Sequence, residues 1–407
     1  MRASSAARIV VAGAALSAWA ISPVGAQKAT RIPLREGLRI VTALNLPDQG
    51  DSESIKTLIR TTDTEVQFKY SWEAVATKDE GNPLAVLFGR GNQPKQTSAP
   101  GKEASHVSVT RTVARQDLKS SHEYRQHFGN GAPERYPGST AVGLSASVLN
   151  ELKSKGQTQL SVDAGGIIGA VGNMVSGLLG SSSTKELDKS TKLAGTLTRV
   201  EAAPVPFKVL VNDQPVELPA LHARGQLGEE DAEFWILDDP ENPLSLKWTI
   251  GEEKLQVIKL AFPADATTAA APGTGAAAPA AAGRIERELE EDGRSAVYGI
   301  YFDFASDRIK EESEPVLKEI AAVMTKYPAW TLAVEGHTDN VGTTADNQDL
   351  SLRRAAAVRK ALGDTYHIPA TRLVPAGFGE SRPKDTNDTL EGRARNRRVE
   401  LARIAKK

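Results

Sequence analysis

The stretch EGHTDNVGTTADNQDLSLRRAAAVRKAL, which spans Glu335–Leu362, decides the fold of the last third of the chain. Residues 330–335 have the apolar character of a β-strand, and the polar residues 336–342 after them predict a turn. Residues 347–362 predict a helix, because their apolar positions form one stripe at about 100° per residue. The members of this stripe are Leu350, Ala357, Val358, Ala361 and Leu362.

One arginine lies within this apolar stripe. Arg354 falls in its middle, whereas Arg353, Arg359 and Lys360 point the other way and are typical of a solvated charged face. An inward guanidinium needs an anionic partner, because an unpaired buried charge is too costly to keep. Spacing alone leaves two candidates for that partner, an internal carboxylate and an anionic ligand.

The residues before this stretch extend the alternation of strand and helix. Ala296–Phe304 (AVYGIYFDF) is apolar and aromatic, which predicts a buried strand. Ser313 is expected to cap the next helix, and Pro315 is expected in its first turn. The apolar face of that helix consists of Val316, Ile320, Val323, Met324 and Tyr327. Residues 285–407 are therefore expected to form an α+β domain.

Five motifs in this region follow one another along the chain. They are FDFASDRI (Phe302–Ile309), EGHTDNVG (Glu335–Gly342), NQDLSLRRAAAVRKAL (Asn347–Leu362), GFGESRP (Gly377–Pro383) and EGRARNRRVEL (Glu391–Leu401). The series resembles the OmpA C-terminal family, which includes the peptidoglycan-associated lipoprotein Pal and the stator protein MotB. The resemblance implies a βαβαβ-type α+β fold. It also implies binding of the diaminopimelate side chain in the peptide stem of Gram-negative peptidoglycan.

The same resemblance assigns roles to two charged residues. Asp339, in the HTD turn, is expected to pair with the free ammonium group of diaminopimelate, and Arg354, in LSLRRA, is expected to pair with its carboxylate. The side chain of diaminopimelate ends in a zwitterion, so one carboxylate and one guanidinium match both of its charges. Arginine suits the second role because its planar fork can bind a carboxylate through two hydrogen bonds.

Further ligand contacts follow from the resemblance. Backbone amides near Ala305 and Ser306 are expected against carboxylate oxygens of the ligand, and the NRRVEL motif adds Arg397 and Arg398, although Arg398 equally fits a structural ion pair. Asn347, Leu350 and Ser351 match the helix motif of the family, where they fit a capping and packing role as well as they fit contact with the ligand. Thr338 and Gly342 are expected to shape the turn. No catalytic residue, cofactor or metal ligand is expected, since binding leaves the bonds of the ligand intact.

Residues 264–284 separate this domain from the rest of the chain. They consist almost entirely of Ala, Pro, Gly and Thr and cannot bury a core, which predicts a flexible linker. Upstream, residues 27–263 carry strand signals, such as the alternation of apolar and polar residues over 65–72. Turn residues such as Asn212–Asp213 separate the apolar runs. We expect a mostly antiparallel β domain of unknown function, with one short helix near 146–153.

Residues 1–26 have the pattern of a secretory signal peptide, with Arg2 and Arg8 before an apolar run that is too short to span a bilayer. The count of 0 cysteines excludes disulfides, thiolate metal sites and lipid attachment at a cysteine. The expected location is the periplasm, either free or associated with the outer membrane. Ala164–Gly180 is apolar and rich in glycine, and a buried connection is favoured there over a membrane segment.

The net charge of -1 argues against a nucleic-acid partner. The leading hypothesis is non-catalytic peptidoglycan binding that anchors the cell envelope, with outer-membrane or periplasmic proteins as partners of the β domain. One alternative is a wall-localised enzyme whose active site lies in the β domain. Another is an outer-membrane β-barrel of the porin type, which the aromatic content of 5% disfavours because such barrels carry aromatic girdles.

Overall fold

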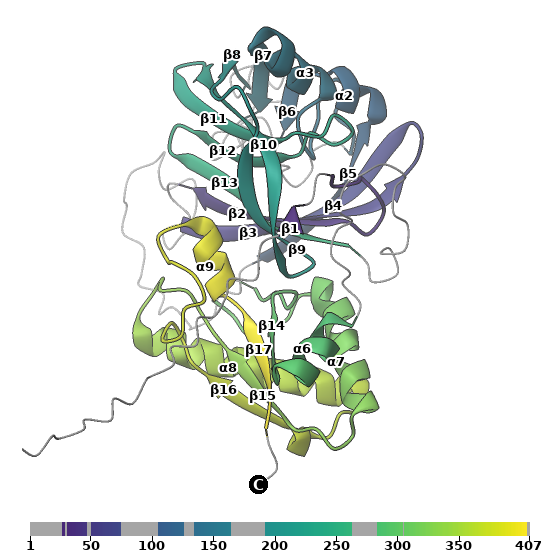
Figure 1. The fold of residues 1–407 in the computed structure, drawn as a ribbon, viewed down its shortest axis with the longest axis vertical. Helices are drawn as coiled ribbons and strands as arrows, with labels where there is room; N and C mark the ends of the chain where they lie inside the picture. The colour runs from purple at the N-terminus through teal and green to yellow at the C-terminus, as the bar shows by residue number, and fades with distance from the viewer. Residues whose placement is uncertain are drawn as a thin grey trace, which may run out of the picture.

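The computed structural model describes residues 27–28, 31–46, 50–74, 105–125, 134–163, 192–262, 283–303 and 305–404. An N-terminal β domain is followed by a C-terminal α+β domain (Figure 1). The expected signal peptide, the Gly-rich segment 164–180 and residues 264–282 of the expected linker lie outside the described residues. Within the described ranges, no helix has the length and apolarity that a membrane crossing requires.

The β domain contains one thirteen-stranded sheet, in which most neighbouring strands are antiparallel. Its strands are β1 (Gln27–Lys28), β2 (Arg39–Leu46), β3 (Gly50–Thr61), β4 (Glu65–Ala74), β5 (Ser105–Ala114), β6 (Glu123–Arg125), β7 (Gln157–Asp163), β8 (Lys192–Arg199), β9 (Val205–Val211), β10 (Gln214–Leu227), β11 (Glu230–Leu237), β12 (Ser245–Ile250) and β13 (Glu253–Ala261). The alternation over 65–72 lies in β4, which pairs with strands on both sides. The prediction of a mostly antiparallel β domain is confirmed.

Two strands of this sheet meet in a hairpin that points toward the C-terminal domain (Figure 1). β9 and β10 are joined by Asn212 and Asp213, whose φ angles of 49° and 65° give the left-handed backbone of a two-residue hairpin turn. β9 also pairs in parallel with β13. Because β10, β11, β12 and β13 pair in succession, strands β9 to β13 close into a ring.

The short helix expected near 146–153 is present as α3 (Ala146–Lys155). Ser145 caps it, since its side chain accepts a hydrogen bond from the amide of Val148 at 3.2 Å. Gly156 ends it with a φ of 75°, a left-handed conformation that favours glycine. A further helix of the β domain is α2 (Arg115–Ser120).

The C-terminal domain has a four-stranded mixed sheet in the order β14-β17-β15-β16. Its elements are α6 (Arg284–Glu291), β14 (Arg294–Val297), the 3-10 turn η2 (Glu311–Ser313), α7 (Glu314–Lys326), β15 (Leu332–Gly336), α8 (Thr344–Tyr366), η3 (Ala370–Arg372), β16 (Leu373–Gly377), α9 (Leu390–Asn396) and β17 (Val399–Arg403). β15 and β16 are parallel, and β17 is antiparallel to both β14 and β15. This mixed sheet with helices confirms the expected α+β fold.

Two predictions about the start of this domain were wrong. The strand expected over 296–304 ends at Val297, because the chain leaves the sheet and places Tyr301 against the β domain. Ser313 precedes α7, but its side chain makes no cap. Its hydroxyl instead accepts from the amide of Tyr301 at 2.9 Å and donates to the carbonyl of Tyr301 at 3.2 Å. Pro315 does lie in the first turn of α7.

The helix expected over 347–362 is α8, which begins earlier and ends later than predicted. Thr343 caps it by accepting from the amide of Asp346 at 3.1 Å, so the capping role considered for Asn347 was wrong. The buried stripe of α8 is Asn347, Ser351, Ala355, Val358 and Leu362. Leu350 and Arg354 lie beside this stripe and are half-buried, whereas Arg353, Arg359 and Lys360 are exposed as predicted.

The two domains pack directly on each other, with α9 against β2 and β13 (Figure 1). An apolar cluster crosses the interface and contains Val41, Ala43, Ile55 and Ile258 of the β domain together with Tyr301 of the C-terminal domain. Next to the hairpin turn, Arg284 at the start of α6 pairs with Asp213 at 3.0 Å, and both side chains are buried. The interface therefore combines apolar packing with a buried ion pair.

Candidate functional site

The turn after β15 is held in place by its backbone. The amide of His337 donates to the carbonyl of Arg398 at 3.0 Å, and the amide of Thr338 donates to the carbonyl of Gly379 at 3.0 Å. These two bonds tie the turn to the segments that precede β17 and follow β16. The residue after them in the chain, Asp339, therefore has a fixed position relative to the sheet.

The carboxylate of Asp339 is oriented within this turn. One of its oxygens accepts from the amide of Val341 at 3.1 Å, and its side chain is buried. The turn comes close to α8 because Gly336 has no side chain: a Cβ there would meet the carbonyl oxygen of Ser351 at 2.1 Å. Strand, turn and helix thus bring Asp339 next to the face of α8 that carries Arg354.

Arg354 reaches from α8 to the loop that follows β14. Its Nε donates to the carbonyl of Ser306 at 2.9 Å, and its Nη2 donates to the carbonyl of Asp303 at 3.4 Å. The guanidinium lies 4.9 Å from the ring centroid of Phe302, within the range of a cation–π contact. These contacts fix the position of the guanidinium at the wall of the cavity described below, and its charge lowers the pKa of Glu53.

The neighbouring arginine behaves differently. Arg353 points to the exposed side of α8, where it pairs with Asp349 at 2.7 Å and with Asp307 at 3.0 Å. Such exposed ion pairs contribute little to stability. The sequence-based distinction between an inward Arg354 and a solvated Arg353 is confirmed by these positions.

The loop between β14 and α7 carries the two backbone amides expected at the ligand. Ala305 has a φ of 49°, a left-handed conformation that is uncommon for a residue with a side chain. The amide of Ser306 donates to the carbonyl of Asp303 at 3.1 Å within the loop. Ala305 lines the cavity described below, whereas Ser306 is not among its lining residues.

Arg397 connects Asp339 to the β domain. Its Nη1 donates to Asp339 at 2.6 Å, and its Nε donates to Glu53 of β3 at 3.2 Å. Burial lowers the pKa of Arg397, but the charges of Glu53 and Asp339 outweigh burial and raise it overall. The guanidinium therefore stays ionised and clamps one carboxylate from each domain.

Arg398 makes contacts of another kind. Its Nε donates to Glu400 at 2.7 Å, and its remaining nitrogens donate to the carbonyls of Asn396 at 3.3 Å and Arg382 at 3.1 Å. These bonds make Arg398 a partner in a structural ion pair, one of the two roles considered from the sequence. It also contributes to the wall of the cavity.

The residues expected at the ligand meet around one cavity of about 200 Å³ between the two domains. Of the residues expected at the ligand or in its turn, those that line the cavity are Ala305, Thr338, Asp339, Asn347, Leu350, Arg354, Arg397 and Arg398, whereas Ser306, Ser351 and Gly342 do not line it. The β domain supplies part of the opposite wall, with Val41, Ser52, Glu53 and Ile258. Sequence reasoning missed Glu53, since the alternation along β3 gives no sign that a second domain covers that position.

Several residues that line this cavity carry buried polar atoms with no hydrogen-bond partner among the described residues. These atoms are Oη of Tyr301, Oδ1 of Asp303, both ring nitrogens of His337 and Oγ1 of Thr338. Buried polar atoms in proteins are nearly always hydrogen-bonded, so a cluster of such atoms around one cavity is typical of a polar ligand site.

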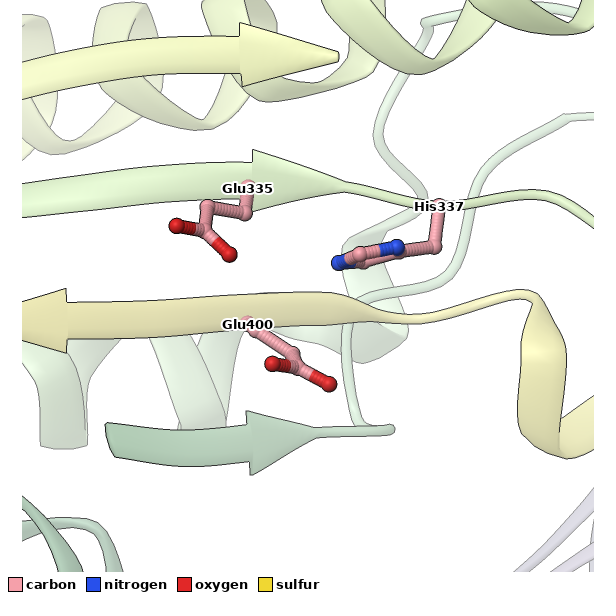
Figure 2. A group of neighbouring side chains, drawn as sticks. All are labelled: Glu335, His337 and Glu400. Atoms are coloured by element: carbon pink, nitrogen blue, oxygen red, sulfur yellow. The ribbon is translucent and has the colours of Figure 1, made fainter. Parts of the chain in front are cut away.

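Beside the cavity, Glu335, His337 and Glu400 form a buried cluster at the ends of β15 and β17 (Figure 2). Their potential ligand atoms lie within 4.8 Å of one another. Arg294 bonds both carboxylates, at 2.9 Å for Glu400, and Arg398 bonds Glu400 as well. These two guanidinium groups balance the two carboxylates, so a bound dication would add uncompensated positive charge. We therefore interpret the cluster as an ion-pair network.

This network also keeps His337 neutral. Burial and the charge of Arg398 lower the pKa of His337 to about 4. Its ring stacks on Phe378, with 5.4 Å between ring centroids. At neutral pH the imidazole therefore adds no charge to the turn that carries Asp339.

The fold and the site define a small α+β domain in which a turn and a helix present opposite charges to one cavity. A model of the OmpA family matches residues 301–397, and this part of the chain is an OmpA family domain. The matched residues include Asp339, Arg354 and Arg397.

Three curated relatives each match about a quarter of this chain. The chain is 50% identical to outer membrane porin F of Pseudomonas aeruginosa over 101 residues, which are 25% of this chain and 29% of that protein. It is 41% identical to outer membrane protein Omp38 of Acinetobacter baumannii over 113 residues, 28% of this chain and 32% of that protein. It is 34% identical to the peptidoglycan-associated lipoprotein of Agrobacterium fabrum over 100 residues, 25% of this chain and 56% of that protein.

Among solved structures, the chain is similar to the peptidoglycan-associated lipoprotein from Burkholderia pseudomallei. The two are 28% identical, the match covers 26% of this chain and 88% of that chain, and the TM-score is 0.25. A MotB-like protein from Desulfovibrio vulgaris is also 28% identical, over 28% of this chain and 74% of that chain, with a TM-score of 0.25. The chain thus spans about 30% of the length of the first curated relatives.

Proposed function

We propose that the C-terminal domain binds peptidoglycan without catalysis, through the zwitterionic end of diaminopimelate. Asp339 pairs with the ammonium group and Arg354 with the carboxylate. The observation that carries this proposal is that Asp339, from a turn, and Arg354, from a helix, line the same cavity with opposite charges. One carboxylate and one guanidinium at fixed positions select a ligand that carries both charges at a matching separation.

Other features of the site support the same ligand class. The unpartnered polar atoms around the cavity, such as Oγ1 of Thr338 and Oδ1 of Asp303, offer additional hydrogen bonds to a polar ligand. A similar protein bears the name peptidoglycan-associated lipoprotein. The names of two further relatives place those proteins in the outer membrane, and we propose a location in the cell envelope for this chain.

The β domain would connect the wall to a second partner. A chain with one wall-binding domain and one further domain can hold an outer-membrane or periplasmic protein near peptidoglycan. Because the wall is a polymer with many identical stems, modest single-site affinity is enough to retain the protein there.

The test is co-sedimentation of the full chain, expressed without residues 1–26, with purified diaminopimelate-type peptidoglycan. We expect Asp339→Ala and Arg354→Ala each to lower binding at least about tenfold, because each leaves one ligand charge buried without its partner. The matched control is Arg353→Ala, the neighbouring arginine on the exposed side of α8, which should change binding less than about twofold.

A second control changes the ligand. Peptidoglycan with lysine in place of diaminopimelate keeps the ammonium group but lacks the carboxylate assigned to Arg354. We expect weak binding to this polymer, and no further loss with Arg354→Ala. Equal binding of wild type and both site variants to diaminopimelate-type peptidoglycan would exclude the proposed site.

A further inference from the structure

The face proposed to bind the wall is the face on which the β domain is docked. β2, β3 and β13 supply one wall of the cavity, opposite the turn of Asp339 and the helix of Arg354. The contact is extensive: it includes the apolar cluster around Tyr301 and a hydrogen bond from Ser71 to Glu312 at 3.0 Å. Both side chains of that bond are largely buried. A docked β domain and a bound polymer stem therefore need the same space.

Glu53 brings a carboxylate into the positive part of this face. Its Oε1 accepts from Nε of Arg397 at 3.2 Å, and Nη2 of the same guanidinium also donates to it. Burial raises the pKa of Glu53, but Arg397 first, and then Lys310 and Arg354, lower it overall. A β-domain carboxylate is therefore held by cations of the C-terminal domain, one of which is the arginine assigned to the ligand carboxylate.

The size of the cavity also indicates that the docked β domain and a peptidoglycan stem compete for the same space. Small-molecule pockets usually enclose ~300–1,000 Å³, whereas about 200 Å³ remains here between the domains. The diaminopimelate group is one side chain of a peptide stem that is joined to glycan strands. Space of this size accommodates a few atoms of such a polymer but not the stem that carries them.

We infer that this face is an interaction surface for two mutually exclusive partners, the wall and the β domain of the same chain, with Glu53 as the carboxylate that the β domain places on it. The inference rests on the proposed function. In the docked form the β domain covers the face, and the wall binds only to the fraction of molecules in which the β domain has left it. The apparent affinity for peptidoglycan is reduced by that fraction.

The first test weakens docking at Glu53 in the full chain. Glu53→Gln removes the charge, and Glu53→Lys places a cation opposite Arg397 and Arg354. We expect both variants to bind diaminopimelate-type peptidoglycan more tightly than wild type, with at least about a threefold gain for Glu53→Lys. The matched control is Glu229→Lys, which makes the same change of charge at an exposed position in the turn between β10 and β11.

The second test prevents the β domain from leaving. Lys69 of β4 and Glu311 of η2 form an ion pair across the interface, and both are accessible, with side chains 30% and 68% exposed. Because the chain has 0 cysteines, Lys69→Cys with Glu311→Cys creates one unique pair for a short bismaleimide. We expect the cross-linked protein to bind peptidoglycan as weakly as the Asp339→Ala variant. The same double variant capped with a monofunctional maleimide should bind like wild type.

The outcomes separate the inference from the function on which it rests. Tighter binding by the Glu53 variants together with loss on cross-linking supports it. Weaker binding by Glu53→Gln, or unchanged binding by the cross-linked protein while Arg354→Ala loses binding, overturns the competition and leaves the wall site in place. No binding by any form, including Glu53→Lys, overturns the proposed function and the inference with it.

Discussion

Both domains bury cationic side chains, but they surround them differently. Lys56, in the core of the β domain, donates to the carbonyl of Ala141 at 2.7 Å and lies 5.7 Å from the ring centroid of Tyr70. Burial lowers the pKa of Lys56 to about 7. Arg397, at the face of the C-terminal domain, lies between two carboxylates that raise its pKa despite burial.

The comparison separates two uses of buried charge. Burial lowers the pKa of the Lys56 ammonium group so far that this group is close to losing its proton at neutral pH. Carboxylates around Arg397 keep the guanidinium ionised and turn it into a connection between domains. The charge of Arg397 at the proposed binding face is therefore fixed by its partners, while the charge of Lys56 in the core of the β domain depends on pH.

The largest effect is expected where the paired arrangement is broken. Arg397→Ala leaves Glu53 and Asp339 facing each other without a cation, and removing one member of a buried pair costs about 3–5 kcal/mol. Differential scanning calorimetry should show the two domains unfolding in separate transitions, with the docked form destabilised. A melting profile that matches wild type would show that this clamp contributes nothing to docking.

The second effect concerns Glu400 at the neighbouring ion-pair network. Burial raises its pKa, but the hydrogen bond from Arg294 and the charge of Arg398 lower it to about 2. Glu400→Gln should destabilise the domain by about 2 kcal/mol at pH 7, since each pKa unit corresponds to ~1.4 kcal/mol and Arg294 is partly exposed.

The sign of the pH dependence follows from that shift. The folded domain holds Glu400 ionised where the unfolded chain begins to take up a proton. Its stabilising contribution is present above the unfolded pKa of about 4.3 and is lost as the pH falls toward 2. Denaturant titrations between pH 2 and 7 should show a steeper loss of stability for wild type than for Glu400→Gln. Parallel curves would contradict this assignment.

In the β domain, replacing a buried charged residue is expected to increase stability, by a smaller amount. Lys56 has a folded pKa of about 7 and an unfolded value near 10.4. Between these values the unfolded chain holds more protons, so stability falls as the pH drops from about 10 to about 7 and then stays constant.

Lys56→Met removes the cost of burying a protonated lysine, but it also removes the hydrogen bond to the carbonyl of Ala141. We expect a net gain in folding stability of about 1–2 kcal/mol at pH 7. The measurement is the urea midpoint at pH 7 and pH 10, and the gain should vanish at the higher pH. A destabilised variant at both values would mean that the hydrogen bond dominates.

The smallest effect belongs to an exposed pair. Lys360 and Asp364 are neighbours on α8, with side chains 76% and 63% exposed. Lys360→Ala should change stability by less than about 0.5 kcal/mol, because exposed ion pairs are screened by solvent. This variant is the baseline for the comparison, and a loss as large as that of Glu400→Gln would remove the distinction between paired charge in the interior and at the surface.

Residues that act within one local element could be predicted from the sequence. The inward position of Arg354 followed from the spacing of α8, and the turn of Asp339 followed from the polar run after a strand. Ser313 shows the limit of such reasoning. Serine before a helix predicts a cap, but the hydroxyl of Ser313 is hydrogen-bonded to the backbone of Tyr301, twelve positions earlier.

The position of Glu53 at the cavity could not be predicted from any local sequence pattern. It faces the cavity because β3 of one domain packs on Arg397 of the other, 344 positions away. Alternation along a strand indicates which side chains share a face, not which domain will cover that face. Contacts between domains depend on shape and charge over whole surfaces, and the sequence of either surface alone does not determine them.

The hairpin turn of Asn212 and Asp213 has a consequence for the chain between the domains. The amide of Phe262, where the β domain ends, donates to Asn212 at 2.8 Å, and Arg284, where the next domain begins, pairs with Asp213 at 3.0 Å. The described residues on both sides of positions 263–282 are therefore fastened at one point. In general, doubling the length of a chain between two fixed ends costs only ~0.6 kcal/mol of closure entropy. The length of the chain between the domains can vary with little effect on docking, yet once the domains part it sets the effective concentration at which the β domain returns.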